Sequence, residues 1–275
     1  MPLQTQGIVL RNRKIQSLYF LLEIECPPIA TLIKPGQFVM LKVCDGQAPL
    51  LRRPFSLFKK DLAQPRGEEK RGWFSILYKK VGRGTQKMTE LGKGKSVDLI
   101  GPLGNGFTTP PPLTSNNKAI LVGGGVGIVS LLPFAEAMQA GRNLFVFIGG
   151  KTDTDILCLK DFKKLNANVF VATEDGSLGR KGTVIDLFLS KRKKLWREGP
   201  CPIYSSGPIG MLKGLAKALG SKRNWCEASF EARMACGFGA CWGCVVKTKD
   251  SKNPYQRVCK EGPVFNLGDI LWEDR

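Results

Sequence analysis

Four cysteines near the C-terminal end constrain the fold of this chain more than any other feature. They are spaced as Cys236-x4-Cys241-x2-Cys244, and Cys259 follows after a longer interval. This C-x4-C-x2-C…C spacing is typical of plant-type two-iron ferredoxins, in which one loop supplies three thiolates and a later turn supplies the fourth. Glycines in the first loop let the backbone curl and bring N–H groups close to cluster sulfurs, where they influence the reduction potential.

Zinc is the competing interpretation of these cysteines. Structural zinc usually takes two short-spaced pairs of ligands, whereas here three cysteines share one glycine-rich loop. The spacing therefore favours a [2Fe-2S] cluster over zinc and over unligated thiols. A disulfide framework is a poor explanation, because the total of nine cysteines is odd and the N-terminal residues do not resemble a secretory signal.

Histidine is absent from the chain. Its absence excludes a Ser-His-Asp triad, a Cys-His dyad, an HExxH zinc site and a Rieske cluster, each of which needs imidazole. Hydride and electron transfer remain, because cofactors carry that chemistry. No apolar run reaches the roughly 18–20 residues that a membrane helix needs, so we expect a soluble cytoplasmic protein.

The net charge is +19, from 42 basic and 23 acidic side chains. The basic residues are spread along the chain in short groups, and no recognition-helix or RNA-binding motif accompanies them. A generally basic composition is the favoured interpretation. An acidic partner surface comes second, and nucleic-acid binding is the least favoured of the three.

The first 110 residues have the pattern of an antiparallel Greek-key β-barrel. Short apolar and aromatic runs alternate with turn signals such as Pro35–Gly36 and Asp45–Gly46, and helical periodicity is missing. Residues 64–71 resemble a solvated hairpin loop. The expected strands are Ile8–Leu10, Leu18–Ile24, Gln37–Val43, Trp73–Tyr78 and Val97–Ile100.

Strands and helices alternate after residues 108–117, a segment whose three consecutive prolines suggest a linker. This alternation favours a Rossmann-like parallel α/β domain. The expected strands are Ala119–Val122, Leu144–Ile148, Val169–Ala172 and Ile203–Tyr204, and the expected helices are Ile128–Met138, Val184–Leu189 and Met211–Leu219. We therefore divide the chain into a barrel domain (1–110), an α/β domain (111–222) and a small cluster domain (223–275).

Two glycine-containing segments in the α/β region suggest a dinucleotide site. Gly123 to Gly127 connect a strand to a helix, which places backbone N–H groups and a helix N-terminus near a phosphate. The strict G-x-G-x-x-G fingerprint is not met, because Ile128 occupies the last glycine position. Ser206–Gly207–Pro208 follows another strand. Either segment alone is also compatible with a purely structural turn.

Two segments of the barrel suggest an anion site. Arg53 and Ser56 flank Pro54 and Phe55 in an extended segment, where an arginine and a hydroxyl can face one phosphate. Gly84–Thr85 then offers N–H groups and a hydroxyl at a turn before a helical stretch. Taken alone, each segment is better explained as a structural turn with solvated bases.

The order of these segments resembles the ferredoxin-NADP reductase superfamily. The appended cysteine block narrows the resemblance to the electron-transfer subunits of dihydroorotate dehydrogenase B, and it extends over nearly the whole chain. The segments that carry it are RRPFS, LYKKVGRGT, GPLGNGF, LVGGGVGI, EDGSLGRKGTV, SSGPIGML and EARMACGFGACWGC…RVC.

The resemblance implies three cofactor sites and no catalytic side chain. FAD would contact Arg53, Pro54, Phe55, Ser56, Leu77, Tyr78, Lys79, Gly84 and Thr85. NAD(H) would contact Gly123, Gly124, Gly125, Val126, Gly127, Ser206, Gly207 and Pro208. The [2Fe-2S] cluster would take Cys236, Cys241, Cys244 and Cys259. Ser206, near the nicotinamide, departs from the cysteine that the superfamily often has there.

The resemblance also implies a partner. An FMN-containing catalytic subunit would oxidise dihydroorotate in pyrimidine biosynthesis, and electrons would pass through the cluster and FAD to NAD+, in a heterotetramer of two plus two chains. Alternatives are a related ferredoxin-NADP or sulfur/sulfite reductase subunit and, from another class, a zinc-stapled nucleic-acid-binding module. NADP stays open as the nucleotide, because Lys151 is placed to meet a 2′-phosphate while Asp153 and Asp155 follow it closely.

Overall fold

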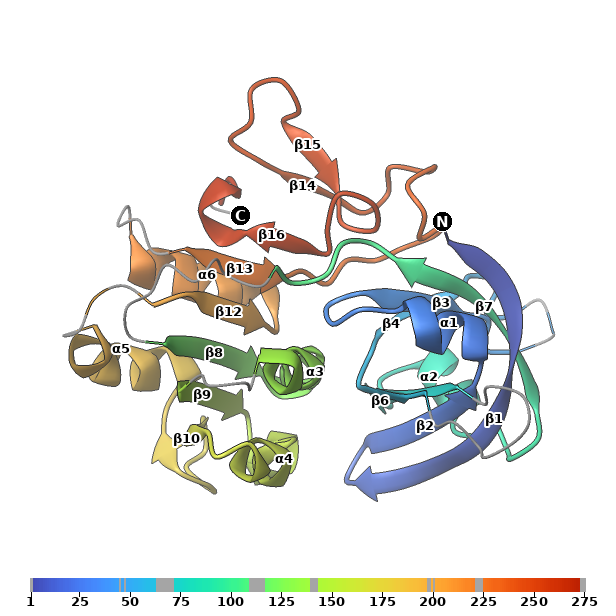
Figure 1. Ribbon diagram of the computed structural model, residues 1–275, viewed down its shortest axis with the longest axis horizontal. Coiled ribbons are helices and arrows are strands. Elements are labelled where there is room, and N and C mark those ends of the chain that lie inside the picture. Colours follow the sequence, from blue (N-terminus) through green and yellow to red (C-terminus); the bar gives the residue numbers. More distant parts are fainter. Residues whose placement is uncertain are drawn as a thin grey trace.

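Two seven-stranded sheets lie side by side in the computed structural model, with the C-terminal cysteine segment above them (Figure 1). The structure describes residues 2–44, 46, 48–62, 72–108, 117–138, 143–196, 199, 201–220 and 225–272. The expected hairpin loop at 64–71, most of the proline-rich linker and both domain boundaries lie outside these residues. In the described part of the chain, no helix is both long and apolar enough to cross a bilayer.

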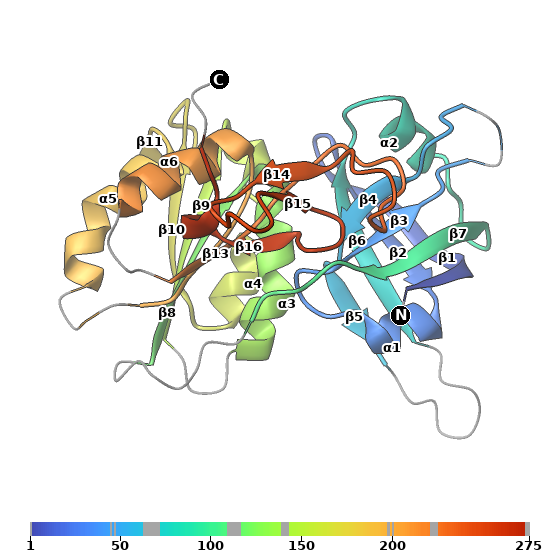
Figure 2. The ribbon, with the colours of Figure 1, turned by 90° about the horizontal axis from the view of Figure 1, so that it is seen from above.

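The N-terminal sheet is antiparallel and curled into a half-barrel, with strand order β4-β3-β7-β1-β2-β6-β5 (Figures 1 and 2). In β7 the buried and half-exposed side chains alternate along the strand, as expected where one sheet face covers a core. The elements are β1 (Leu3–Gln16), β2 (Tyr19–Glu25), α1 (Pro27–Leu32), β3 (Phe38–Leu41), β4 (Arg53–Ser56), β5 (Lys59–Asp61), β6 (Trp73–Lys79), α2 (Arg83–Met88) and β7 (Ser96–Leu103).

One expectation about this region is made more specific and another needs correction. The expected extended segment Arg53–Ser56 is the strand β4, which pairs with β3. Pro54 is tolerated there because β4 is an edge strand, where a missing N–H breaks no ladder on the outer side. Gly84 and Thr85, expected at a turn before a helix, lie inside α2.

The second sheet has the strand order β11-β10-β9-β8-β12-β13-β16, and all its pairs are parallel except β13–β16. Its central strand β8 is almost wholly buried, as expected for a parallel strand covered on both faces. The elements up to α6 are β8 (Lys118–Gly124), η1 (Gly125–Gly127), α3 (Ile128–Met138), β9 (Asn143–Gly150), η2 (Asp153–Asp155), α4 (Leu159–Lys164), β10 (Asn168–Thr173), β11 (Arg180–Lys181), α5 (Val184–Leu195), β12 (Ile203–Ser206) and α6 (Ile209–Leu219).

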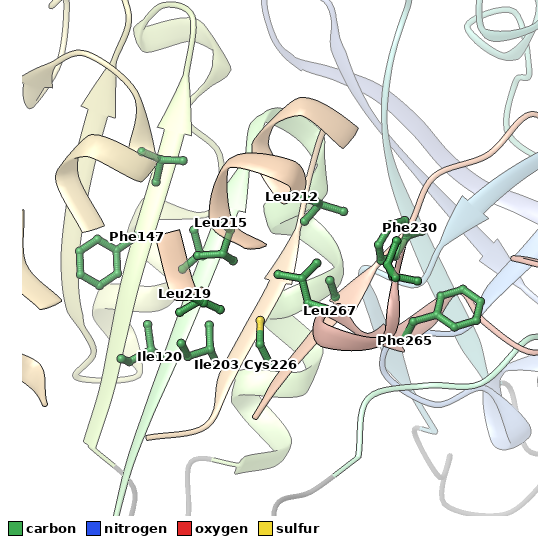
Figure 3. Close-up of a cluster of buried hydrophobic side chains, with 14 of the residues drawn as sticks. Ile120, Phe147, Ile203, Leu212, Leu215, Leu219, Cys226, Phe230, Phe265 and Leu267 are labelled. Atoms are coloured by element: carbon green, nitrogen blue, oxygen red, sulfur yellow. The ribbon is translucent and has the colours of Figure 1, made fainter. Parts of the chain in front are cut away.

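Helices cover both faces of this sheet (Figure 2). On one face α5 and α6 bury an apolar stripe, and Figure 3 shows Leu215 and Leu219 among Ile120, Ile203 and Phe147. Burying such a side chain contributes about 1.5–3 kcal/mol. On the other face α3 and α4 share a core cluster with the barrel, so the two sheets are joined by continuous apolar packing.

The cysteine segment begins and ends in the second sheet. It leaves β13 (Cys226–Ser229), forms the small sheet of β14 (Val245–Lys247) and β15 (Tyr255–Arg257), and returns as β16 (Val264–Asn266) before η3 (Leu267–Asp269). Both figures place it over the seam between the two large sheets (Figures 1 and 2). The expected cluster domain thus shares two strands with the α/β sheet.

Candidate functional site

A cleft of about 360 Å³ lies where the barrel, the α/β sheet and the cysteine segment meet. Its barrel wall contains seven of the residues expected at the flavin: Pro54, Phe55, Ser56, Leu77, Tyr78, Lys79 and Thr85. The α/β wall contributes the start of α3 and Ser206. The cysteine segment contributes the third wall, with Glu231, Met234 and Pro263.

The aromatic floor of this first cleft is held rigidly. Tyr78 stacks on Phe20 with ring centroids 5.6 Å apart and meets Phe55 edge-on at 6.1 Å. Its hydroxyl donates to Asn12 Oδ1 at 3.2 Å, and burial raises the pKa of Tyr78 to about 12. The phenol is therefore neutral at physiological pH and presents a fixed planar surface.

Arg53 and Gly84 lie in contact beside the first cleft, although neither lines it. A Cβ added to Gly84 would come within 2.7 Å of Arg53 Nε, so only glycine lets α2 approach the guanidinium this closely. Thr85 Oγ1 accepts hydrogen bonds from the N–H groups of Val81 at 2.9 Å and Gly82 at 3.2 Å. A fixed cation and a short turn of helix thus flank one end of the cleft.

A second cleft, of about 660 Å³, lies at the carboxyl ends of β8, β9 and β10. That edge is where parallel α/β sheets bind nucleotides. Of the residues expected at the dinucleotide, four line it: Gly124, Gly125, Val126 and Pro208. Several carboxylates also face it, namely Asp155, Glu174, Asp186 and Glu231, together with Lys79 and Lys151.

The remaining glycines support the turn rather than line the second cleft. A Cβ on Gly127 would lie 2.6 Å from the backbone of Gly207, and a Cβ on Gly123 would collide with Ile128. The two glycine segments therefore pack directly on each other. Ser206 opens into the first cleft, and its hydroxyl lies 3.0 Å from that of Ser130.

Three residues line both clefts: Lys79, Val126 and Glu231. Glu231 was not predicted as a site residue from the sequence. Its position in the chain, between β13 and the cysteine loop, could have suggested it. Burial in the concave junction raises the pKa of its carboxyl group. A carboxylate and an ammonium group thus face the point where ligands of the two clefts would meet.

Lys79 also joins the barrel to the α/β region. Its ammonium group lies 2.8 Å from Asp155 Oδ1, and the Tyr19 hydroxyl donates to the same oxygen at 2.5 Å. Burial alone would raise the pKa of Asp155, but the bonds from Lys79 and Tyr19 outweigh it and hold the pKa below its usual value. This cluster fixes the two regions beside the shared wall of the clefts.

The four cysteines form two pairs. The N–H of Cys241 lies 3.5 Å from Cys236 Sγ, and that of Cys259 lies 3.4 Å from Cys244 Sγ. Burial would raise the pKa of Cys236, but N–H groups of the loop outweigh it and lower the pKa to about 6. Cys241 is exposed and Cys236 half-buried, whereas Cys244 and Cys259 are buried.

This donor set fits a two-iron cluster. Within the described residues, no three Cys, Asp or Glu side chains converge as a mononuclear ion would require. A [2Fe-2S] cluster instead needs two cysteines on each iron, and the structure supplies two pairs, with loop N–H groups that favour the thiolate of Cys236. Structural zinc would instead need four ligands around one point.

Comparison with known proteins decides the family. Residues 231–271 match the model of the iron-sulfur cluster binding domain of dihydroorotate dehydrogenase B. A dihydroorotate dehydrogenase B (NAD(+)) electron transfer subunit of Fusobacterium nucleatum is 39% identical over 240 residues, covering 86% of each chain. The chain belongs to this family. A second such subunit, of Desulforamulus reducens, is 36% identical and covers 92% of this chain and 93% of its own.

The folds of solved structures agree with this family assignment. An NADH-dependent reduced ferredoxin-NADP oxidoreductase, studied for flavin-based electron bifurcation, superposes with a TM-score of 0.78 at 26% identity, over 97% of this chain and 90% of that chain. The ferredoxin reductase of carbazole 1,9a-dioxygenase shares the fold, with a TM-score of 0.63 at 19% identity, over 80% of this chain and 66% of that chain. The expected membership of the ferredoxin-NADP reductase superfamily is confirmed.

Proposed function

We propose that this chain carries electrons from an FMN-containing dihydroorotate dehydrogenase catalytic subunit, through a [2Fe-2S] cluster and FAD, to NAD+ in pyrimidine biosynthesis. One observation carries the proposal. The first and second clefts are both lined by Lys79, Val126 and Glu231. Met234 and Pro263 of the cysteine segment also line the first cleft. A flavin in the first cleft would therefore lie between the other two redox groups.

FAD is the ligand that suits the first cleft. Its isoalloxazine ring would lie against Tyr78 and beside Ser56, and Arg53 with the α2 turn at Gly84–Thr85 would take the pyrophosphate. Pro54, Phe55, Leu77 and Lys79 complete the wall. When bound, FAD supplies the ability to accept a hydride pair and to release single electrons. The side chains would hold the ring in place and exclude water from its inner face.

NAD(H) is the ligand that suits the second cleft. The packed turn of Gly123 to Gly127 would bring backbone N–H groups to its pyrophosphate, and Ser206–Gly207–Pro208 would hold the nicotinamide toward the first cleft. Glu174, Asp155 and Asp186 make the cleft wall acidic around Lys151. A 2′-phosphate would be repelled there, so we propose NAD rather than NADP.

The exposed side of the cysteine segment is the face that we assign to the catalytic partner. Cys241 is exposed, its loop neighbours Phe238 and Trp242 are 50% and 53% exposed, and Tyr255 on β15 is 53% exposed. Exposed aromatic groups of this kind are enriched at protein interfaces. An assembly of two catalytic and two electron-transfer chains is the stoichiometry that we propose.

The domain boundaries and the cellular compartment complete the proposal. The curled half-barrel is assigned as the Greek-key flavin domain at 1–110, followed by the nucleotide domain at 111–222 and the cluster domain at 223–275. None of the nine cysteines forms a disulfide. A chain without disulfides agrees with a reducing compartment, so we assign the protein to the cytoplasm.

The decisive experiment is an anaerobic visible spectrum of the purified protein before and after NADH is added. We expect flavin and iron–sulfur absorption that bleaches with NADH. The Cys241→Ser variant should lose the iron–sulfur absorption, whereas Cys201→Ser, just before β12 and outside the cysteine segment, should keep it. A colourless protein that binds zinc but no iron would contradict the proposal.

A related ferredoxin-NADP or sulfur/sulfite reductase subunit is the second candidate, favoured only by the likeness to the NADH-dependent oxidoreductase. Purification with the natural partner separates the two. A partner containing FMN, together with dihydroorotate-dependent reduction of NAD+, supports the first candidate. Polysulfide or sulfite reduction would support the second.

A further inference from the structure

Arg257, on the short strand β15, makes two separate contacts with the cysteine loop. Its Nη1 donates to the carbonyl oxygen of Gly239 at 2.7 Å, inside the loop between the first two cysteines. Its guanidinium also lies over the ring of Trp242, 4.2 Å from the centroid. One side chain on β15 therefore holds two separate points of the loop, one on each side of Cys241.

Trp242 is held in an unusual backbone conformation. Its φ of +54° lies in the left-handed region, which is unfavourable for a residue other than glycine. Its side chain is 53% exposed, so burial alone does not offset that cost. The contact with Arg257 holds the indole against the guanidinium, at a position in the chain between Cys241 and Cys244.

The guanidinium itself is anchored by Glu261. Arg257 Nε donates to Glu261 Oε2 at 3.0 Å, and Nη2 donates to Oε1. The Arg257 side chain is only 14% exposed and that of Glu261 33% exposed. A positive and a negative charge therefore both lie close to the buried cysteine pair.

We propose that Arg257 and Glu261 set the reduction potential of the cluster, and that Arg257 also positions its loop. The inference rests on the proposed function, because it requires the [2Fe-2S] cluster at these cysteines. Reduction adds one negative charge to the cluster. A nearby cation favours the reduced state and a nearby anion disfavours it, and screening is weak where the charges are partly buried.

The two charges therefore have opposite effects. Removing Arg257 leaves Glu261 unpaired beside the cluster and lowers its midpoint potential. Removing the charge of Glu261 leaves Arg257 unpaired and raises the potential. Removing both brings the potential back toward that of the wild type. A purely structural role would instead lower cluster occupancy in each variant without shifting the potential in opposite directions.

The test is an anaerobic redox titration of the purified full-length protein, with the reduced cluster followed by electron paramagnetic resonance. The variants are Arg257→Gln, Glu261→Gln and the double variant. Arg257→Lys keeps the charge but loses the planar guanidinium group that bonds Gly239 and Glu261 together. It should therefore keep the potential near that of the wild type while lowering the iron content. Arg192→Gln is the matched control, because Arg192 also lies over a tryptophan ring, at 5.8 Å from Trp196, and bonds a carbonyl, that of Ala218.

We expect a lower midpoint for Arg257→Gln, a higher one for Glu261→Gln, and none of these changes for Arg192→Gln. Shifts of the same sign, or no shift beyond the control, would overturn the inference while leaving the cluster itself established. If Arg257→Gln fails to load iron, Glu261→Gln and Arg257→Lys still decide the outcome. A wild-type protein without iron would instead refute the proposed function.

Discussion

The ammonium group of Lys79 lies 2.8 Å from Oδ1 of Asp155, across the junction between the half-barrel and the α/β sheet. Both residues line the second cleft, and Lys79 lines the first as well. Removing the charge by Asp155→Asn should lower the free energy of unfolding by about 1–3 kcal/mol, because the bond to Lys79 loses its ionic partner in a partly buried site. Urea denaturation followed by circular dichroism measures the change.

A control for this variant exists in the same chain. Lys87 and Glu90 form an ion pair whose side chains are 49% and 55% exposed. Since exposed pairs contribute little, Lys87→Gln should change the unfolding free energy by about 0.5 kcal/mol or less. Equal effects of the two substitutions would show that the junction pair contributes no more than a surface pair.

The effect of Asp155→Asn should depend on pH in a defined direction. The folded protein holds the pKa of Asp155 below its usual value. A depressed carboxyl pKa contributes stability that is present above the unfolded pKa of roughly 3.9 and is lost as the pH falls through the folded pKa. The stability difference between wild type and variant should be constant from neutral pH to about 5 and should shrink below about 4. A difference that grows on acidification would contradict this assignment.

Gly127 should be indispensable to the nucleotide site. A methyl group there meets the backbone of Gly207 at 2.6 Å, and backbone atoms cannot move aside as a flexible side chain can. We expect Gly127→Ala to raise the Kd for NADH by about tenfold or more, equivalent to ~1.4 kcal/mol, while FAD content is unchanged. Fluorescence titration measures the Kd. Gly92→Ala, where a methyl group meets nothing within 4 Å, serves as control.

Gly84→Ala should separate flavin binding from stability. The added methyl group meets the flexible end of Arg53, so the helix is expected to tolerate it and the melting temperature to change little. The displaced guanidinium should lose its bond to the flavin pyrophosphate, which is worth about 1.5–3 kcal/mol. FAD occupancy after dialysis would fall. A loss of thermal stability with FAD retained would show that Arg53 has a structural role only.

Glu231→Gln tests the carboxylate shared by both clefts. Oxidation of the nicotinamide makes its ring positive, so a nearby carboxylate should favour NAD+ over NADH. We expect the variant to bind NAD+ more weakly by about 1 kcal/mol, roughly fivefold, with NADH binding nearly unchanged. Because burial raises the pKa of Glu231, acidification should weaken NAD+ binding in the wild type but not in the variant. Equal weakening of both nucleotides would contradict an electrostatic role.

Local patterns in the sequence were sufficient for much of this architecture. The helix Ile128–Met138 was predicted with its observed bounds, because a long apolar run after a glycine turn has few alternatives. β1 was underestimated: only Ile8–Leu10 was expected, whereas the strand covers Leu3–Gln16, since its polar residues face solvent and hide the pattern. The cysteine spacing predicted three ligands on one loop and a fourth from a later turn, and the division into Cys236 with Cys241 and Cys244 with Cys259 is seen only in the structure.

Contacts between distant segments could not be predicted. Tyr19 and Asp155 are separated by 136 positions, and no local pattern links them. Glu231 gains its place only when β13 joins the α/β sheet beside β12, which brings the start of the cysteine segment to the junction of the clefts. Which predicted residues of each site line a cleft, and which stand behind it, likewise depends on how the two sheets pack.

The return of the cysteine segment through β16 has a consequence for how such proteins diversify. Ser229 and Val264 are paired neighbours at the point where the segment leaves and re-enters the sheet. The segment is therefore topologically a long hairpin loop, and a short turn in its place would leave both strands in register. Exchanging this one loop would replace a single wall of the first cleft, that of Glu231, Met234 and Pro263. The same pair of clefts would then lie beside a different redox group.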